Sequence, residues 1–445
     1  MKSIIFIAAF CFCSLASYAQ KGWTLEECIQ YATANNITIK QIQLQKENAE
    51  VNLNTSQMSR LPDLNAGIGQ NWSFGRTQMV TGLYENQSQS NTSLSVSSSV
   101  PLFTGFRITN EIARNKLTLQ AATENLSKAK EDLSLGIASL FLQALFNKEI
   151  LKVNQEQLLL SQIQITKTRS MVEAGKVPQS QLYDIEAQVA KDEVTVIQAK
   201  NNLALALLDL AQSLELENQT GFDIYAPEMN DVISEYMSSV QPPLIIYNNA
   251  LNTKPVVKAQ EYTVQSAEKT LHIAKSGYLP SLSLSLGYGT NYFYRYNLSA
   301  TLANTAFGEQ LKNNAGEYIG LSLSIPVFNR FSVRNQVRNA QINIYNQQLE
   351  LDNVKKTLYK EIQTAYLNAT AAQEKYRASD KAVKATTESF KYAQERYEVG
   401  KSSVFEFNEA KTKLTQSQSE QIQAKYDYIF RTKILDFYNG VPLEL

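Results

Sequence analysis

Four short segments of the chain alternate hydrophobic residues with polar residues or glycine, which is the pattern of a β-strand with one apolar face. In the second of them Leu94, Val96 and Val100 alternate with serines, and the pattern ends at Pro101. The predicted strands cover residues about 63–74, 92–101, 281–295 and 317–326. Two strands therefore fall in each half of the chain.

Long stretches with helical spacing follow the second strand of each half. Residues about 107–173 contain no proline and a single glycine, Gly136, and Leu133, Ile137 and Leu140 have the three-and-four spacing of a packed helix face. At a rise of 1.5 Å per residue, this helix would be about 100 Å long. A further helix is expected before the first strand, over residues about 25–60. The other predicted long helices cover residues about 179–216, 331–398 and 403–438.

The two halves carry similar motifs in the same order, which predicts an internal duplication. IQAK occurs at residues 197–200 and again at 422–425, an offset of 225 residues. Earlier in each half, RLPDLNAGIG at 60–69 matches YLPSLSLSLG at 278–287, at an offset of 218. Each half is thus predicted to contain a helix, two strands and two long helices.

The N-terminus has the features of a secretory signal peptide. Lys2 precedes an apolar run from residue 4 to residue 15, and Ser17 and Ala19 fit the small-residue cleavage rule. An uncleaved anchor helix is the alternative, but about a dozen apolar residues are too few to span a bilayer. The predicted parts of the chain are a signal peptide at 1–19, a first repeat at 20–216, a linker at 217–245, a second repeat at 246–440 and a C-terminal tail at 441–445.

The predicted strands have the length of strands that cross an outer membrane. Four strands cannot close a barrel, and an open sheet edge in lipid would leave backbone groups unpaired at several kcal/mol each. Three copies would supply twelve strands, which predicts a homotrimer. A water-soluble α+β domain explains the alternation equally well, but it does not explain the aromatic residues near the strand ends. These are Trp72, Phe74, Tyr292, Phe293, Tyr294 and Tyr296.

Composition excludes several other classes of protein. Lys plus Arg and Asp plus Glu both number 42, so no basic excess would attract nucleic acid. The mature chain keeps one cysteine, Cys28, and one histidine, His272, which argues against a Cys/His metal cluster. Gly67 and Gly69 begin a dinucleotide-loop pattern, but Trp72 stands where its third glycine should be. Neither an enzyme nor a bound cofactor is therefore expected.

Four motifs resemble the TolC-like outer-membrane efflux protein family over essentially the whole mature chain. They are TLEECIQYATANN at 24–36, YLPSLSLSLGYG at 278–289, GLSLSIPVFNRFSVRNQVRNA at 320–340 and YEVGKSSVFEFNEAKTKL at 397–414. The resemblance implies an α/β membrane protein in which four transmembrane strands per protomer complete a trimeric 12-stranded barrel. A long periplasmic α-helical barrel would contact a periplasmic adaptor and an inner-membrane pump. The implied function is the exit duct of a tripartite efflux or type I secretion system.

The resemblance also implies roles for the two turns between the long helices. The residues expected to contact the adaptor are Gly175, Lys176, Gly400, Lys401 and Ser402. Glu406 and Glu409 lie six and nine residues after Gly400, where the family has the acids of its periplasmic aperture. Threefold symmetry would gather these carboxylates into a ring that attracts cations and raises their pKa. The family's arginine tether is replaced here by Ser402. The alternative is that both glutamates only solvate a helix.

Two other classes of exported protein share some of these features. A coiled-coil adhesin or scaffold would share the signal and the helices, but it does not require strand pairs at matching positions. A periplasmic adaptor would carry one helical hairpin rather than two helix pairs. The sequence leaves the cargo open among drugs, metal ions, polysaccharides and secreted proteins.

Overall fold

The structure, a computed structural model, describes residues 22–78, 82–219, 221–226, 241–296, 298, 303–441 and 443. The predicted signal peptide lies outside the described residues, as do residues 227–240 of the predicted linker. The described chain divides into two compact units, each of which takes segments from both halves of the sequence. The helical unit comprises residues up to 44, 124–258 and 353–445, and the sheet unit comprises residues 45–123 and 259–352.

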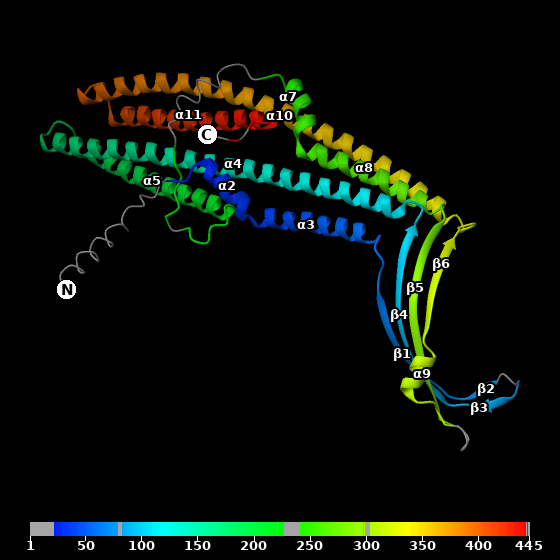
Figure 1. The fold of residues 1–445 in the computed structure, drawn as a ribbon. Helices are drawn as coiled ribbons and strands as arrows, with labels where there is room; N and C mark the ends of the chain where they lie inside the picture. Colours follow the sequence, from blue (N-terminus) through cyan, green and yellow to red (C-terminus); the bar gives the residue numbers. More distant parts are fainter. Residues whose placement is uncertain are drawn as a thin grey trace, which may run out of the picture. The chain divides into compact units, whose positions relative to one another are not determined.

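The sheet unit contains a four-stranded antiparallel sheet in the order β1-β4-β5-β6 (Figure 1). Its strands are β1 (Asn65–Ser73), β4 (Gln89–Phe103), β5 (Ser281–Arg295) and β6 (Gly316–Ser324). The central pair, β4 and β5, joins the two halves of the sequence. The outer strands β1 and β6 each have one edge with no strand partner among the described residues.

The register places most of the large hydrophobic side chains on one face of this sheet. Directly opposed residues share a face, and Val96 opposes both Ala66 and Tyr288, while Leu284 opposes Leu321. The hydrophobic residues of this apolar face are Ala66, Ile68, Trp72, Leu94, Val96, Val100, Phe103, Leu282, Leu284, Leu286, Tyr288, Tyr292, Tyr294, Ile319, Leu321 and Leu323. Ile68 is 81% exposed and Ile319 is 79% exposed. A large apolar surface is thus uncovered in the single chain.

The opposite face of the sheet carries mainly serine and glycine. Ser95 opposes both Gly67 and Gly289, and Ser283 opposes Ser322. The serines and glycines of this serine-glycine face are Gly67, Gly69, Ser73, Ser93, Ser95, Ser97, Ser99, Ser281, Ser283, Ser285, Gly287, Gly289, Gly316, Gly320, Ser322 and Ser324. Asn65, Asn71, Gln89, Asn91, Pro101, Asn291, Phe293 and Arg295 share this face. Tyr318 belongs to this face too, and its ring covers Gly287, where an added Cβ would lie 2.2 Å from the ring carbon Cε1.

Two loop elements of the sheet unit were not predicted. A small hairpin pairs β2 (Arg76–Gln78) with β3 (Tyr84–Asn86), and a short helix, α9 (Phe307–Asn313), packs on β5. Gln310 of α9 accepts a hydrogen bond from the backbone N–H of Phe293 and donates one to its carbonyl, at 3.0 and 2.9 Å. This amide therefore satisfies a part of β5 that extends beyond the end of β6.

Two predicted elements differ from the observed ones. β4 continues past Pro101 and ends at Phe103. The pairing with β5 shifts register between these two residues. This irregularity accommodates Pro101, because proline has no backbone N–H to donate. The helix expected over residues 25–60 is two helices, α2 (Leu25–Asn35) and α3 (Ile37–Met58). They separate at Asn36, whose Oδ1 accepts from the backbone N–H groups of Thr38 and Ile39 and thereby caps the second helix.

The helices of the two halves form matching series of lengths. The bounds of the others are α4 (Arg107–Glu173), α5 (Gln179–Ser213), α7 (Pro243–Thr253), α8 (Pro255–Ser276), α10 (Ser332–Glu398) and α11 (Val404–Tyr438). α2 and α7 have 11 residues each, α3 and α8 have 22, α4 and α10 have 67, and α5 and α11 have 35. The starts of α4 and α10, at residues 107 and 332, differ by the 225 residues that separate the repeated motifs.

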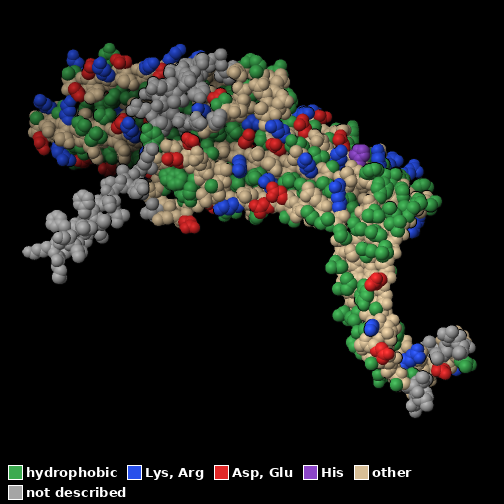
Figure 2. Space-filling view, in the orientation of Figure 1, with side chains coloured by type: hydrophobic (Ala, Val, Ile, Leu, Met, Phe, Trp, Pro, Cys, Tyr) green, Lys and Arg blue, Asp and Glu red, His purple; other side chains and the backbone are tan. Residues whose placement is uncertain are grey.

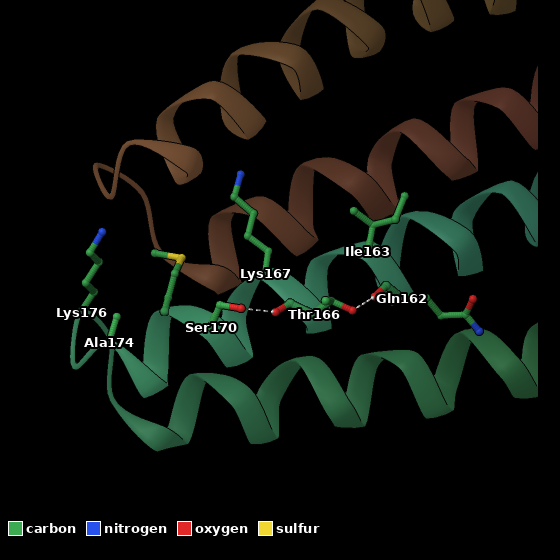
Figure 3. Close-up of a pocket in the computed structure, with 8 residues that line it drawn as sticks. Gln162, Ile163, Thr166, Lys167, Ser170, Ala174 and Lys176 are labelled. Carbon is green, nitrogen blue, oxygen red and sulfur yellow. Dashed lines mark hydrogen bonds between the residues drawn. The ribbon is translucent and has the colours of Figure 1, made fainter.

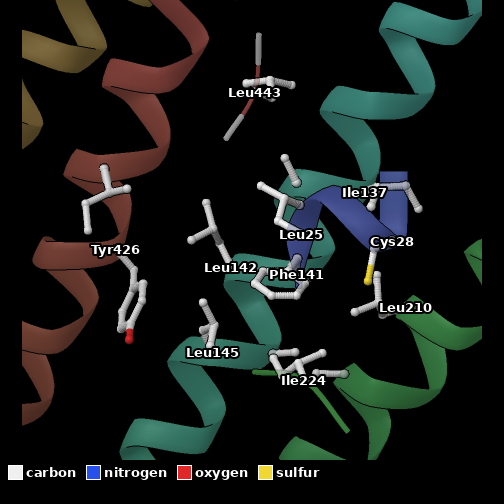
Figure 4. Packing of buried hydrophobic residues seen from close by; sticks show 14 of the residues in the cluster. Leu25, Cys28, Ile137, Phe141, Leu142, Leu145, Leu210, Ile224, Tyr426 and Leu443 are labelled. Carbon is white, nitrogen blue, oxygen red and sulfur yellow. The ribbon is translucent and has the colours of Figure 1, made fainter. Parts of the chain in front are cut away.

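A buried cluster in the helical unit joins α2 to the first pair of long helices and to α11. Figure 4 shows Leu25 and Cys28 of α2 close to Phe141 of α4 and Leu210 of α5. Phe141 is 1% exposed, and the cluster also contains Tyr428 of α11. Burial raises the pKa of the Cys28 thiol to about 12, so this thiol stays protonated and unreactive at neutral pH.

Charged side chains are distributed unevenly over the visible surface. Figure 2 shows many Lys, Arg, Asp and Glu side chains on the long helices and few on the visible face of the sheet. No described helix combines the length and the apolar content needed to cross a bilayer.

Candidate functional site

Two helical hairpins of the helical unit end in turns with the same backbone geometry. The first hairpin is α4 and α5, the second is α10 and α11, and their turns contain Gly175 and Gly400 at φ values of +69° and +72°. In the second turn, Gly400 N–H donates to Tyr397 O at 3.0 Å and Lys401 N–H donates to Arg396 O at 2.8 Å. The first turn has the same two bonds, so both are Schellman motifs, in which glycine takes the left-handed position. This geometry explains the glycine that recurs in both turns.

The role of the turn glycine can be tested against a glycine inside a helix. Gly400→Ala should destabilise the protein by about 1–2 kcal/mol, because alanine is strained in the left-handed region although space for its Cβ is open. Gly136→Ala, within α4 and also with open space around the added Cβ, should stabilise the protein by about 0.5–1 kcal/mol. Thermal unfolding of both variants should give shifts of opposite sign, and shifts of the same sign would contradict this assignment.

The two predicted acids lie on one exposed face of the first turns of α11. Glu406 and Glu409 are both exposed and are three residues apart, a spacing that places side chains on the same side of a helix. Phe407, between them, is buried and its ring lies 5.2 Å from that of Tyr397. Because Phe407 points into the hairpin, the two carboxylates point away from it.

Glu406 is held by neighbours from its own hairpin. Ser402 Oγ donates to its Oε2 at 2.5 Å, Arg396 Nη2 lies 3.7 Å from the same oxygen, and Ser403 Oγ accepts from its backbone N–H at 3.2 Å. The hydrogen bond from Ser402, followed by the charge of Arg396, lowers the pKa of Glu406. Within one chain this shift is opposite to the one expected for a ring of carboxylates. Glu409 pairs with Lys413 at 2.7 Å.

Sequence comparison with the family missed the role of Arg396. Ser402 stands where the resemblance led us to expect an arginine, and Arg396 lies close to the acid from the last turn of α10. Arg396 also donates to Lys401 O at 3.4 Å. Arg396 lies in the last turn of α10, where the helix dipole favours a cation. This position was the signal in the sequence that could have pointed to Arg396.

The two hairpins contact each other near their turns. Thr168 Oγ1 lies 3.3 Å from Tyr397 Oη, and Lys167 Nζ lies 3.2 Å from Glu398 Oε1. A buried cluster joins α5, α10 and α11 here and consists of Ile185, Phe390, Tyr397, Val404, Phe407 and Leu414. The end of each hairpin is therefore packed against the other.

An open groove of about 660 Å³ lies along the last turns of α4 (Figure 3). It is lined by Gln162, Ile163, Thr166, Lys167, Ser170, Met171, Ala174 and Lys176. The hydroxyls of Thr166 and Ser170 donate to carbonyls of their own helix, at 3.1 and 3.2 Å. The groove thus offers apolar side chains and two lysines to a partner, and it contains the predicted contact residue Lys176.

Comparison with known proteins identifies both the family and the fold of this chain. The outer membrane efflux protein family model matches residues 28–215 and 246–436. TolC of Escherichia coli is 24% identical over 420 residues, covering 91% of this chain and 80% of that protein. The efflux protein BepC of Brucella suis is 21% identical over 412 residues, covering 90% and 84%. The crystal structure of CusC superposes with a TM-score of 0.77 at 18% identity, covering 96% of each chain.

These matches confirm the predicted fold class, the outer-membrane location and the efflux function, and they give no support to an adhesin or scaffold. The family consists of channel proteins. Since the family model covers most of the sequence in two blocks, one in each half, the chain belongs to the outer membrane efflux protein family and is an efflux channel of the outer membrane.

Proposed function

We propose that three copies of this chain form the exit duct of a tripartite efflux or type I secretion system, through which solutes pass without chemical change. The observation that supports this most directly is the sheet with an exposed apolar face, a serine-glycine face and two unpaired edges. In lipid each unpaired backbone group costs several kcal/mol, so the edges need strand partners. Pairing β6 of one copy with β1 of the next satisfies both edges.

The two faces then have different surroundings. The apolar face contacts lipid, and the serine-glycine face lines the passage. Two copies would give only eight strands, whose interior is filled by side chains, whereas three give twelve and an open channel. The aromatic residues near the strand ends, including Trp72 and Tyr294, suit the interfaces of the membrane.

The long hairpins extend the duct into the periplasm, where an adaptor joins it to an inner-membrane pump. We assign the adaptor contact to the groove along α4 and to the two turns, with Gly175, Lys176, Gly400, Lys401 and Ser402. An exposed surface that combines apolar side chains such as Ile163 and Met171 with lysines suits a protein partner. Glu406 and Glu409 of three copies form the acidic ring at the periplasmic end.

The chain is divided into a signal peptide, two repeats and a linker between them. Residues 1–19 direct export and are removed, the repeats cover residues 20–216 and 246–440, and residues 217–245 link them. Equal helix lengths in the two halves support the repeats.

A pair of arginine substitutions on neighbouring positions of β6 tests the duct. Leu321→Arg places a charge on the apolar face and should destabilise membrane insertion by about 2–4 kcal/mol, so that less trimer is recovered from membranes. Ser322→Arg, the matched control, places the same charge on the serine-glycine face and should leave assembly intact. The measurement is the mass of the detergent-solubilised protein, expected at about three times the mass of the chain without its signal peptide, with bilayer conductance as the functional readout. A soluble monomer without detergent would reject the duct.

A further inference from the structure

The sheet unit joins its strands to its long helices through two junctions of the same form. In the first, the rings of Phe103 and Phe106 lie 5.3 Å apart at 87° to each other. In the second, the rings of Phe328 and Phe331 lie 5.7 Å apart at 86°. All four side chains are exposed, from 37% for Phe103 to 72% for Phe328. Each junction therefore displays a pair of aromatic rings that the chain itself does not cover.

The second junction carries an arginine at a strained position. Two consecutive residues of each junction take the left-handed conformation, Gly105 and Phe106 in the first and Arg330 and Phe331 in the second. The φ value of Arg330 is +54°, in a region where glycine is unstrained and a residue with a Cβ is not. Since the first junction has glycine at this position, the turn does not require the arginine side chain.

Arg330 begins a stripe of three exposed arginines, which continues with Arg334 and Arg338 at the start of α10. Positions four apart lie on one face of a helix, where like charges repel each other. Arg334 Cζ lies 5.7 Å from the centre of the Phe331 ring. Among the described residues no carboxylate forms an ion pair with any of the three. Negative charge from outside the chain would therefore stabilise this arginine stripe.

The first junction has no such stripe. Gly105 and Thr109 stand at the positions that correspond to the first two arginines. Its own arginine, Arg107, pairs with Glu111 at 2.9 Å. An anion that recognises the stripe would thus find one site per chain, at the second junction.

Basic residues predominate around both junctions, although they balance the acids in the chain as a whole. The segments next to the strands, residues 58–63, 107–118, 266–276 and 330–340, contain nine Lys and Arg against three Asp and Glu. The basic residues are Arg60, Arg107, Arg114, Lys116, Lys269, Lys275, Arg330, Arg334 and Arg338. In Figure 2, Lys and Arg side chains lie beside hydrophobic side chains where these helices join the strands.

In the proposed duct the junctions lie at the periplasmic surface of the membrane. The long helices extend into the periplasm, so the strand ends that join them face that side. Phe103 opposes Leu282 on the apolar face of the sheet, and its ring therefore continues the surface that contacts lipid. Aromatic rings are enriched at the level of the headgroups, which carry the negative charge of anionic lipids.

We propose that the arginine stripe and the rings of Phe328 and Phe331 form a binding site for an anionic phospholipid of the periplasmic leaflet. The rings contact the acyl chains next to the headgroup. The guanidinium groups donate to the phosphate oxygens, which arginine binds in a bidentate manner. The phosphate supplies the negative charge that the start of α10 lacks. The site rests on the proposed function, because it requires that the apolar face contact lipid.

The test counts the lipids bound per chain of the mature protein by native mass spectrometry in a neutral detergent. Dioleoyl phosphatidylglycerol is titrated into the micelles, and in parallel dioleoyl phosphatidylcholine, which has a phosphate but no net charge and should bind more weakly. Arg330→Gln with Arg334→Gln and Arg338→Gln should weaken phosphatidylglycerol binding by about 100-fold, because each arginine at an anionic membrane surface contributes about fivefold.

The matched control removes three charges from other positions of the same helix. Lys356→Gln with Lys381→Gln and Lys391→Gln changes exposed lysines of α10, and this variant should bind phosphatidylglycerol as the wild type does. Equal weakening in both triple variants would reject the site, because net charge alone would then explain the loss. Equal affinity of the wild type for the two lipids would also overturn the proposal.

Two measurements on the wild type remain informative if the arginine variant assembles poorly. Phosphatidylglycerol binding should weaken as NaCl is raised, because salt screens exposed charges, and binding independent of salt would reject the arginine stripe. Excess inorganic phosphate should leave the bound lipid in place, since the free anion makes no contact with the rings. Displacement of the lipid by phosphate would identify a site for the free anion and overturn the lipid assignment.

Bilayer conductance keeps this inference separate from the proposed function. The arginine variant should conduct as the wild type does, since the stripe is not part of the acidic ring. If the wild type forms no channel, the proposed duct fails. The lipid count in micelles does not depend on conductance, so it still decides whether the arginine stripe binds phosphatidylglycerol.

Discussion

Replacing Glu406 and Glu409 together with glutamine is expected to raise conductance through the closed channel and to weaken its block by divalent cations. In a threefold assembly six carboxylates would surround the axis. Unit charges about 8 Å apart interact by roughly 0.5–2 kcal/mol, depending on the local dielectric. Loss of one such attraction should weaken cation block by roughly 2- to 30-fold. Single-channel recordings with increasing Mg²⁺ provide the measurement.

Glu406 keeps its charge at a lower pH than an ordinary glutamate does. The hydrogen bond from Ser402 lowers the pKa of Glu406, so this carboxylate stays ionised at neutral pH, and its favourable contacts are lost only as pH falls through that lowered pKa. The matched control for the double glutamine variant is Glu374→Gln with Glu388→Gln, which removes two exposed charges from α10. Cation block in this control should match the wild type. Unchanged single-channel behaviour in the Glu406 and Glu409 variant would reject the ring.

Phe141→Ala is expected to cost about 3–5 kcal/mol of the free energy of unfolding, the largest effect on stability considered for this chain. The ring is 1% exposed and lies in the cluster that joins α2, α4, α5 and α11. Its removal leaves a cavity among neighbours such as Leu25 of α2 and Leu210 of α5, whose helices are held in place by the other contacts of the cluster. Denaturant or thermal unfolding of the detergent-solubilised protein gives the measurement.

A graded substitution at the same position controls for non-specific damage. Phe141→Leu keeps most of the apolar volume and should cost less than half as much as Phe141→Ala. Equal destabilisation by both substitutions would show that the loss does not arise from the cavity. Destabilisation below about 1 kcal/mol in both would show that this cluster contributes little to the core.

Regular periodicity made the long elements predictable from the sequence. The helix predicted around Gly136 has the same bounds as α4. The prediction succeeded because no proline interrupts this stretch. The alternation around Leu94 predicts a strand, and the register of β4 places it on the apolar face. Family membership and fold class were predicted because motifs recur in both halves.

Elements that depend on single side chains could not be predicted in the same way. The break between α2 and α3 depends on the capping oxygen of Asn36, and α9 depends on Gln310 satisfying the edge of β5. At the candidate site, the resemblance to the family pointed to Glu406 and Glu409 through their distance from Gly400. The ion pair between Lys411 of α11 and Asp192 of α5 joins residues 219 positions apart, and periodicity carries no signal for such a contact.

The serine-glycine face of the sheet has a consequence for selectivity in the proposed duct. Among the paired positions of this face in the described strands, Arg295 at the far end of β5 is the single ionisable residue apart from Tyr318, whose ring covers Gly287. Hydroxyl groups, glycines and uncharged amides such as Asn71 and Asn91 therefore form a wall that is nearly neutral. Cargo of either charge would meet the same surface there, so discrimination among molecules belongs to the acids of α11 and to the proteins that load them.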